Sequence, residues 1–134
     1  VLMFQKEVAD RIIAKSNTSA YGRLSILSNW KLNIEKIFDI KPKSFSPKPK
    51  IDSSLLVFTP KNNFFKIKDP KNLEKVTRIF FNQRRKMIKK PFNQLFNGNQ
   101  KIIDKLKIDL NQRPQNLDFN TYYHLTSLYE NLRS

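Results

Sequence analysis

A dense group of cations is the strongest chemical signal in the sequence. Its members are Arg84, Arg85, Lys86, Lys89 and Lys90, and no acidic residue interrupts them. If one helix carried this group, Arg78, Arg85 and Lys89 would share a face, at steps of seven and four residues. Such a row of cations can follow the phosphates of a nucleic-acid backbone. We therefore predict phosphate contacts here, the alternative being an ordinary solvated helix face.

A proline-punctuated segment, residues 41–50, holds a second candidate. Each proline fixes its own φ and restricts the residue before it, so we expect a stiff, extended loop. Within it, Phe45 is followed by Pro47, Lys48, Pro49 and Lys50. An aromatic side chain on a cationic loop can stack on an unpaired base. The residues alone leave another interpretation equally open, in which Phe45 anchors the loop against a sheet.

The usual catalytic side chains are scarce. His124 is the only histidine and there is no cysteine, which excludes two-histidine metal motifs, disulfides and thiolate chemistry. We expect His124 to be a partly buried structural residue. Ser53 and Ser54 lie in a predicted strand with no base nearby in the sequence. Glu7 and Asp10 are better explained as charges near a helix start than as an acid/base pair. The residues therefore predict binding and show no chemistry.

The composition points to a folded protein with a polyanionic partner. Lysine and arginine number 26 against 11 acids, a net charge of +15, and 39% of the residues are hydrophobic. The two glycines, Gly22 and Gly98, lie too far apart for a phosphate-binding loop. No strongly amphipathic basic helix stands out, which favours nucleic acid over a membrane surface. The apolar run at residues 1–4 is too short to span a membrane, and without a secretory signal we expect a cytoplasmic protein.

The first 68 residues predict alternating strands and helices. Residues 1–4 are typical of a buried parallel strand, which needs neighbours, so the chain is expected to begin within a larger fold. Elsewhere the spacing predicts helices over residues 5–15 and 23–30, the second burying Leu24, Ile26 and Leu27, and strands over residues 31–40 and 51–59. Residues 61–68 read as a linker.

From Asp69 onward the pattern is helical only. Asp69 and Pro70 form an N-cap followed by a first-position proline. The helix that follows is predicted to run on through Arg84–Lys86, and Pro91 to kink or restart it. Asn97-Gly98-Asn99 predicts a turn, and two more helices are marked by Ile102, Ile103, Leu106 and Leu110 and by Tyr122, Leu125, Tyr129 and Leu132. We therefore divide the chain into an α/β part, residues 1–68, and a helical part, residues 69–134.

Four segments, in order, resemble one family. They are M-F-Q-K-E-V-A-D-R-I, Y-G-R-L-S, F-S-P-K-P-K-I-D-S and F-N-Q-R-R-K, which begin at residues 3, 21, 45 and 81. Together they are similar to the KsgA family of rRNA adenine N6,N6-dimethyltransferases, over essentially the whole chain. The third segment is shared with the erythromycin-resistance methyltransferases, whereas the others point to the ribosome-biogenesis branch.

The resemblance implies a fold, an activity and roles for residues. The fold is a Rossmann-like α/β methyltransferase domain followed by a small all-α domain. The activity is the transfer of methyl groups from S-adenosylmethionine to N6 of two adjacent adenines near the 3′ end of small-subunit (16S) rRNA. Phe45 would pack on the flipped adenine, with Pro47 and Pro49 holding its loop. The full set of expected RNA contacts is Lys48, Lys50, Arg78, Arg84, Arg85, Lys86, Lys89 and Lys90.

The chain also departs from the family pattern. The glycine-rich cofactor loop, the acidic ribose ligand and the Asn-Leu-Pro-Tyr segment of the family all belong upstream of the matched part. S-adenosylmethionine is therefore expected to bind a missing N-terminal half, and the chain to be inactive alone. The rival hypothesis is a non-catalytic RNA-binding or ribosome-assembly module, and a weaker one a DNA- or transcription-related relative. We expect a monomer that binds small-subunit rRNA or the immature small subunit, without metal or membrane.

Overall fold

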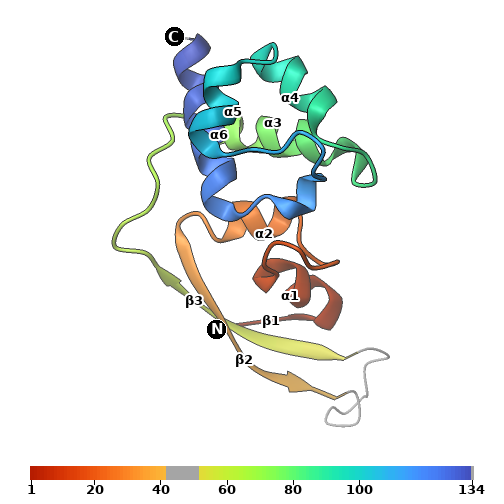
Figure 1. Cartoon of the computed structure of the whole chain (residues 1–134). Helices are drawn as coiled ribbons and strands as arrows, with labels where there is room; N and C mark the ends of the chain where they lie inside the picture. The colour runs from red at the N-terminus through yellow and green to blue at the C-terminus, as the bar shows by residue number, and fades with distance from the viewer. Residues whose placement is uncertain (42–51, 134) are drawn as a thin grey trace.

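A computed structural model describes residues 1–41 and 52–133. Figure 1 shows a small sheet at one end, a group of helices at the other, and α1 and α2 between them. The elements are β1 (Leu2–Gln5), α1 (Lys6–Ile13), α2 (Arg23–Ser28), β2 (Leu32–Ile40), β3 (Ser53–Pro60), α3 (Pro70–Phe80), the 3-10 helix η2 (Phe81–Gln83), α4 (Lys89–Phe96), α5 (Gln100–Leu106), η3 (Pro114–Asn116) and α6 (Phe119–Arg133). The expected mixture of strands and helices is confirmed.

The sheet has the strand order β1-β3-β2, and both pairings are antiparallel. The expectation of a buried parallel strand at residues 1–4 is therefore wrong, because β1 pairs with a much later strand that runs the opposite way. Met3 and Phe38 both lie opposite Leu55 in the register, so the three side chains share one face. Met3 is 53% exposed and Phe38 52% exposed. An apolar row therefore crosses the three strands in the open.

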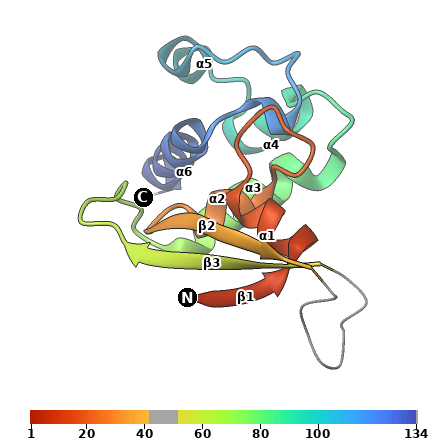
Figure 2. The same cartoon turned by 90° about the horizontal axis from the view of Figure 1, so that it is seen from below.

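Helix α1 covers the other face of the sheet, and Figure 2 shows the helices gathered on that side. Its buried Ala9 and Ile12 pack against Leu56 of β3. On the same face the Ser54 hydroxyl donates a 2.6 Å hydrogen bond to Asp39 of β2, which holds the pKa of Asp39 below its ordinary value despite the opposing effect of burial. Ser54 therefore joins two strands.

The acids of α1 pair along the helix. Lys6 bonds to Asp10 at 3.0 Å and Arg11 to Glu7 at 2.7 Å, each four residues apart. Glu7 and Asp10 are therefore ion-pair partners of cations on their own helix.

The larger core joins segments far apart in the sequence. Tyr21, Ile26 and Trp30 pack with buried side chains of α3, α4 and α6, such as Phe80 and Tyr122. Three tyrosine hydroxyls donate to backbone carbonyls across this core: Tyr21 to Leu117, Tyr122 to Pro114 and Tyr123 to Ile26, at 2.6 to 2.8 Å. Burial raises the pKa of all three tyrosines. Neutral phenols thus satisfy carbonyls that the core would otherwise leave unpaired.

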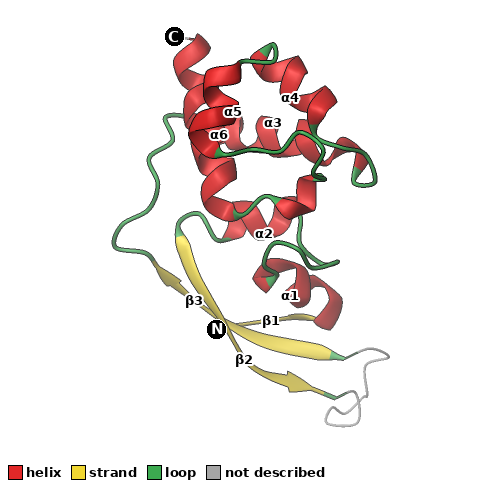
Figure 3. Cartoon of the chain, in the orientation of Figure 1, coloured by secondary structure: helices red, strands yellow, loops and turns green. Residues whose placement is uncertain are grey.

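Local signals around the helices are confirmed. Asp69 caps α3 by accepting a hydrogen bond from the Lys71 backbone N–H. Asn97 and Gly98 take positive φ at the turn after α4, where glycine is free to do so. Figure 3 shows residues 61–69 as a loop, yet Trp30 Nε1 donates to the Phe65 carbonyl at 2.6 Å. The connecting segment is therefore fastened to the core.

Three side chains lie further out than expected. His124 is exposed, with its ring edge-on to Phe65 at 4.6 Å between centroids, so the prediction of partial burial is wrong. Leu24 is exposed on α2 while Ile26 is buried, because α2 turns only one side to α3. Leu132 is also exposed, on the last turn of α6, where the helix extends past the core.

Candidate nucleic-acid interface

The cations expected on one helix are divided among three elements. Helix α3 ends at Phe80, the chain tightens into η2, and α4 begins at Lys89. The backbone N–H of Ile88 donates to Gln112 at 2.8 Å, and the Ile88 side chain is fully buried. This long-range anchor turns the chain, so the expectation of a continuous helix with Arg78, Arg85 and Lys89 on one face is wrong. Pro91 falls in the first turn of α4, where its missing N–H costs nothing.

The turn brings most of the cations together in another way. A groove of about 780 Å³ lies between the end of α3 and the start of α4. Its walls include four exposed cations, Arg85, Lys86, Lys89 and Lys90. No acidic residue lines it. A cationic groove of this kind attracts phosphate, and the floor of Ile79 and Phe80 supplies apolar contact.

Four amide side chains and a methionine, none of them among the predicted contacts, line the same groove. They are Asn82, Gln83, Asn93, Gln94 and Met87. Amides offer both donors and acceptors, which suits base edges and sugars. The signal was present, because the pair Asn-Gln occurs on each side of the cations.

Arg84 lies apart from the groove and has a different immediate contact. Its Nη1 donates to the Tyr21 carbonyl at 2.6 Å and its Nη2 to the Ser19 carbonyl at 3.2 Å. The guanidinium also lies over the ring of Phe81 and fills the space beside Gly22, where an added Cβ would come within 3.1 Å. Arg84 thus ties the loop before α2 to the segment just after η2.

The remaining expected contacts lie elsewhere. Arg78 is exposed on α3 and is not among the residues that line the groove. Phe45, Pro47, Lys48, Pro49 and Lys50 lie outside the described residues. The chain on either side of them is held together, because Ile40 pairs with Ser53 and the Lys41 ammonium lies 3.5 Å from the Asp52 carboxylate.

The described part of the chain has neither a cluster of metal ligands nor a membrane-spanning helix. Across residues 1–41 and 52–133, no three histidine, cysteine, aspartate or glutamate side chains gather as ligands for a metal ion. In the same two ranges, no helix combines the length and the apolar character that a membrane crossing requires.

Comparison with known proteins decides the family. The model of the ribosomal RNA adenine dimethylase family matches residues 1–131. The chain belongs to the ribosomal RNA adenine dimethylase family. The dimethylase relatives include the ribosomal RNA small subunit methyltransferase A of Pelagibacter ubique, 71% identical over 133 residues, which are 99% of this chain and 51% of the relative. The protein of the same name from a Wolbachia strain of Drosophila simulans is 42% identical, over 96% of this chain and 47% of the relative.

Solved structures agree with the dimethylase assignment. A dimethyladenosine transferase from Plasmodium falciparum superposes with a TM-score of 0.74 at 27% identity, covering 98% of this chain and 56% of the other. The 23S rRNA methyltransferase ErmE shares the fold, with a TM-score of 0.63 at 17% identity over 98% of this chain and 53% of the other. The chain therefore spans about half the length of the dimethylase relatives that it matches.

The residues present do not fit S-adenosylmethionine. A methyl-donor site of this fold needs glycines where backbone approaches the cofactor. The space beside Gly22 is filled by Arg84, and Gly98 lies in the turn between α4 and α5. Neither glycine opens a cofactor loop, so no methyl-donor site is assigned to this chain.

Proposed function

We propose that this chain is the rRNA-binding and base-presenting part of an enzyme that dimethylates N6 of two adjacent adenines near the 3′ end of small-subunit rRNA. The observation that carries the proposal is the acid-free groove between α3 and α4, in a chain that belongs to the dimethylase family. Arg85, Lys86, Lys89 and Lys90 hold phosphates along that groove. Arg78, Lys48 and Lys50 extend the cationic surface, while Arg84 contributes through the N–H groups that do not bond the backbone.

In this proposal the two parts of the chain have different roles. Residues 1–68 complete the α/β methyltransferase domain, and residues 69–134 form the helical rRNA-binding domain. The enzyme acts as a monomer in the cytoplasm on the immature small subunit. Because the glycines of this chain do not fit S-adenosylmethionine, the methyl donor is held by protein outside these 134 residues.

Phe45 supplies the step closest to the chemistry. The N6 lone pair of adenine is delocalised into the ring, so N6 is a poor nucleophile and the base must be held out of its stack. Stacking on an aromatic side chain contributes about 1–3 kcal/mol per base. Pro47 and Pro49 restrict the backbone around Phe45, which lowers the cost of presenting it.

A chimera tests the proposal. The part of the Pelagibacter ubique relative that this chain does not match is joined upstream of the chain, and transfer of labelled methyl groups from S-adenosylmethionine to unmethylated small subunits is measured. We expect two methyl groups on each of two adjacent adenines. If the chimera binds small-subunit rRNA and binds S-adenosylmethionine but transfers nothing, the non-catalytic RNA-binding module replaces the enzyme.

A further inference from the structure

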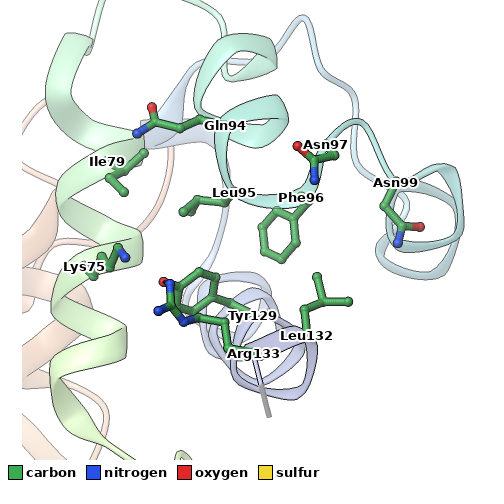
Figure 4. Close-up of a pocket in the computed structure, with 10 residues that line it drawn as sticks. All are labelled: Lys75, Ile79, Gln94, Leu95, Phe96, Asn97, Asn99, Tyr129, Leu132 and Arg133. Carbon is green, nitrogen blue, oxygen red and sulfur yellow. The ribbon is translucent and has the colours of Figure 1, made fainter.

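A second pocket lies on the helical part, next to the cationic groove. It has a volume of about 620 Å³, within the usual range for small-ligand sites. Figure 4 shows its lining residues, which come from α3, α4, α6 and the turn after α4. In this view Phe96 points toward Tyr129 and Leu132, while Leu95 points toward the side of Ile79 and Lys75. The pocket therefore has an apolar wall.

Two cations give the same pocket a positive side. Arg133 Nη1 donates to the Tyr129 hydroxyl at 2.8 Å, and the Lys75 ammonium lies 5.2 Å from the centre of the Tyr129 ring. Burial raises the pKa of Tyr129, but hydrogen bonds from Lys75 and Arg133 outweigh it and leave the pKa below its ordinary value. No acid lines the pocket, and neither cation belongs to an ion pair found in the described residues. Both cations thus retain donors for an anion.

The pocket continues the cationic groove. Ile79 and Gln94 line both hollows. Because the two hollows share these residues, one bound strand can contact both the groove and the pocket. The free amide of Gln94 lies at the junction, and Asn97 lies on the pocket wall. Each amide can pair with donors and acceptors on a base edge.

We propose that this pocket holds one unpaired nucleotide of the bound rRNA. Lys75 and Arg133 take its phosphate, while the base lies against Leu95 and Leu132 with its edge toward Gln94 and Asn97. An RNA single strand fits these observations because its bases are free to leave the stack and because the pocket joins the groove that binds phosphate. The inference rests on the proposed function, since it extends the same RNA path.

Binding of two RNA probes tests the inference. A labelled short single-stranded RNA and a blunt duplex of the same length are titrated with the chain, its double variant Lys75→Gln/Arg133→Gln, and Leu132→Ser. We expect the double variant to bind the single strand about tenfold more weakly, with a salt slope lower by about one, because the two cations share one phosphate. Leu132→Ser leaves the charge unchanged and should weaken only the single strand. The control Lys105→Gln removes one exposed charge from α5 and should lower affinity least.

A direct measurement guards against misfolded variants. Methyl resonances of Leu95 and Leu132 in the unaltered chain should shift when the single strand is added and stay in place with the duplex. If the pocket variants bind both probes as the unaltered chain does, while Arg85→Gln and Lys89→Gln weaken binding, the pocket inference is overturned and the groove stands. Equal weakening for both probes without methyl shifts also overturns it, leaving a simple phosphate contact. If the groove variants have no effect either, the proposed function itself fails.

Discussion

Arg84 sits where two distant parts of the chain meet. Its guanidinium spans the carbonyls of Ser19 and Tyr21, more than sixty residues earlier, and also faces the ring of Phe81. The planar fork of arginine fixes two N–H donors in directions that match the two carbonyls, whereas the donors of a lysine ammonium all radiate from one nitrogen. Its neighbour Arg85 has the same charge but faces the groove. Of these two adjacent arginines, Arg84 therefore stabilises the fold, whereas Arg85 is placed to bind a ligand in the groove.

Replacing each arginine with lysine should show which of the two stabilises the fold. We expect Arg84→Lys to lower the free energy of unfolding by about 1–3 kcal/mol, because charged hydrogen bonds to two carbonyls are lost. The matched control Arg85→Lys should change stability little. Urea unfolding measures both. A loss no larger for Arg84→Lys than for Arg85→Lys would contradict the structural role.

Glu130 gives the fold a pH dependence. Its buried carboxylate accepts hydrogen bonds from Asn72 and from the backbone N–H groups of Lys68 and Asp69. Burial raises its pKa, but these hydrogen bonds outweigh burial and lower the pKa below 4.5. The folded value lies below the unfolded one, so the stabilisation is complete above the unfolded pKa and disappears as pH falls through the folded pKa.

Glu130→Gln should therefore cost stability mainly at neutral pH. Urea unfolding of the variant and the unaltered chain is compared from neutral pH down to the acid range. We expect the difference between them to shrink as the pH drops below 4.5. A constant difference across that range would show that the charge on Glu130 does not contribute.

Phe45 is expected to separate binding from methylation. In an active enzyme containing this chain, Phe45→Ala should lower the methylation rate far more than rRNA affinity, because stacking orients one base while the phosphates supply most of the affinity. Methyl transfer and rRNA binding are measured on the same preparation. Equal losses in both would rule out the stacking role.

At the scale of elements, the break between α3 and α4 creates the groove. A continuous helix would spread its cations around and along one rod. The η2 turn and the restart at Lys89 instead place Arg85, Lys86, Lys89 and Lys90 around one hollow. The arrangement concentrates positive potential, which raises the local attraction for phosphate.

Single charge removals in the groove should show this. Arg85→Gln and Lys89→Gln should each reduce the slope of log affinity against log salt by about one for small-subunit rRNA. The control Lys101→Gln lies on the exposed side of α5 and should leave the slope nearly unchanged. If all three variants behave alike, the attraction is diffuse and the groove has no special part in it.

Local and long-range signals explain what the sequence could predict. The helix start at Asp69-Pro70 and the turn at Asn97-Gly98 could be predicted, because capping and backbone preference depend only on residues a few positions apart. The break before α4 was missed because Ile88 is held there by a hydrogen bond to Gln112, far along the sequence. The distance in sequence also hid the contact of Arg84 with Tyr21, so its charge suggested RNA alone. The groove could not be predicted from the sequence, because it forms only where the chain turns between α3 and α4.

At the scale of the whole molecule, the sheet has two unlike faces. One is covered by α1, whereas the other carries the row of Met3, Leu55 and Phe38. Exposed apolar rows beside strand edges favour association between copies. The sheet end of the chain therefore favours self-association through its exposed apolar row, and the cationic groove lies at the opposite, helical end.

Charged substitutions on that row should improve the behaviour of the isolated chain. We expect Met3→Lys and Phe38→Lys to lower light scattering at high protein concentration, with the fold retained by circular dichroism. Leu24→Lys is the matched control, since Leu24 is also an exposed apolar residue but lies on α2. If Leu24→Lys lowers scattering equally, net charge and not the row is responsible.

The shared core has a consequence for how such proteins can exchange parts during evolution. Tyr21, Ile26 and Trp30 precede the sheet's last two strands, yet their side chains complete the packing of α3, α4 and α6. A recombination that moved only the helical segment into a relative would set it against foreign residues at these three positions. Successful exchanges must therefore carry residues 21–30 along or preserve their shapes. The unit that must be inherited together therefore consists of residues 21–30 and the later helices, which are separated in the sequence by two strands.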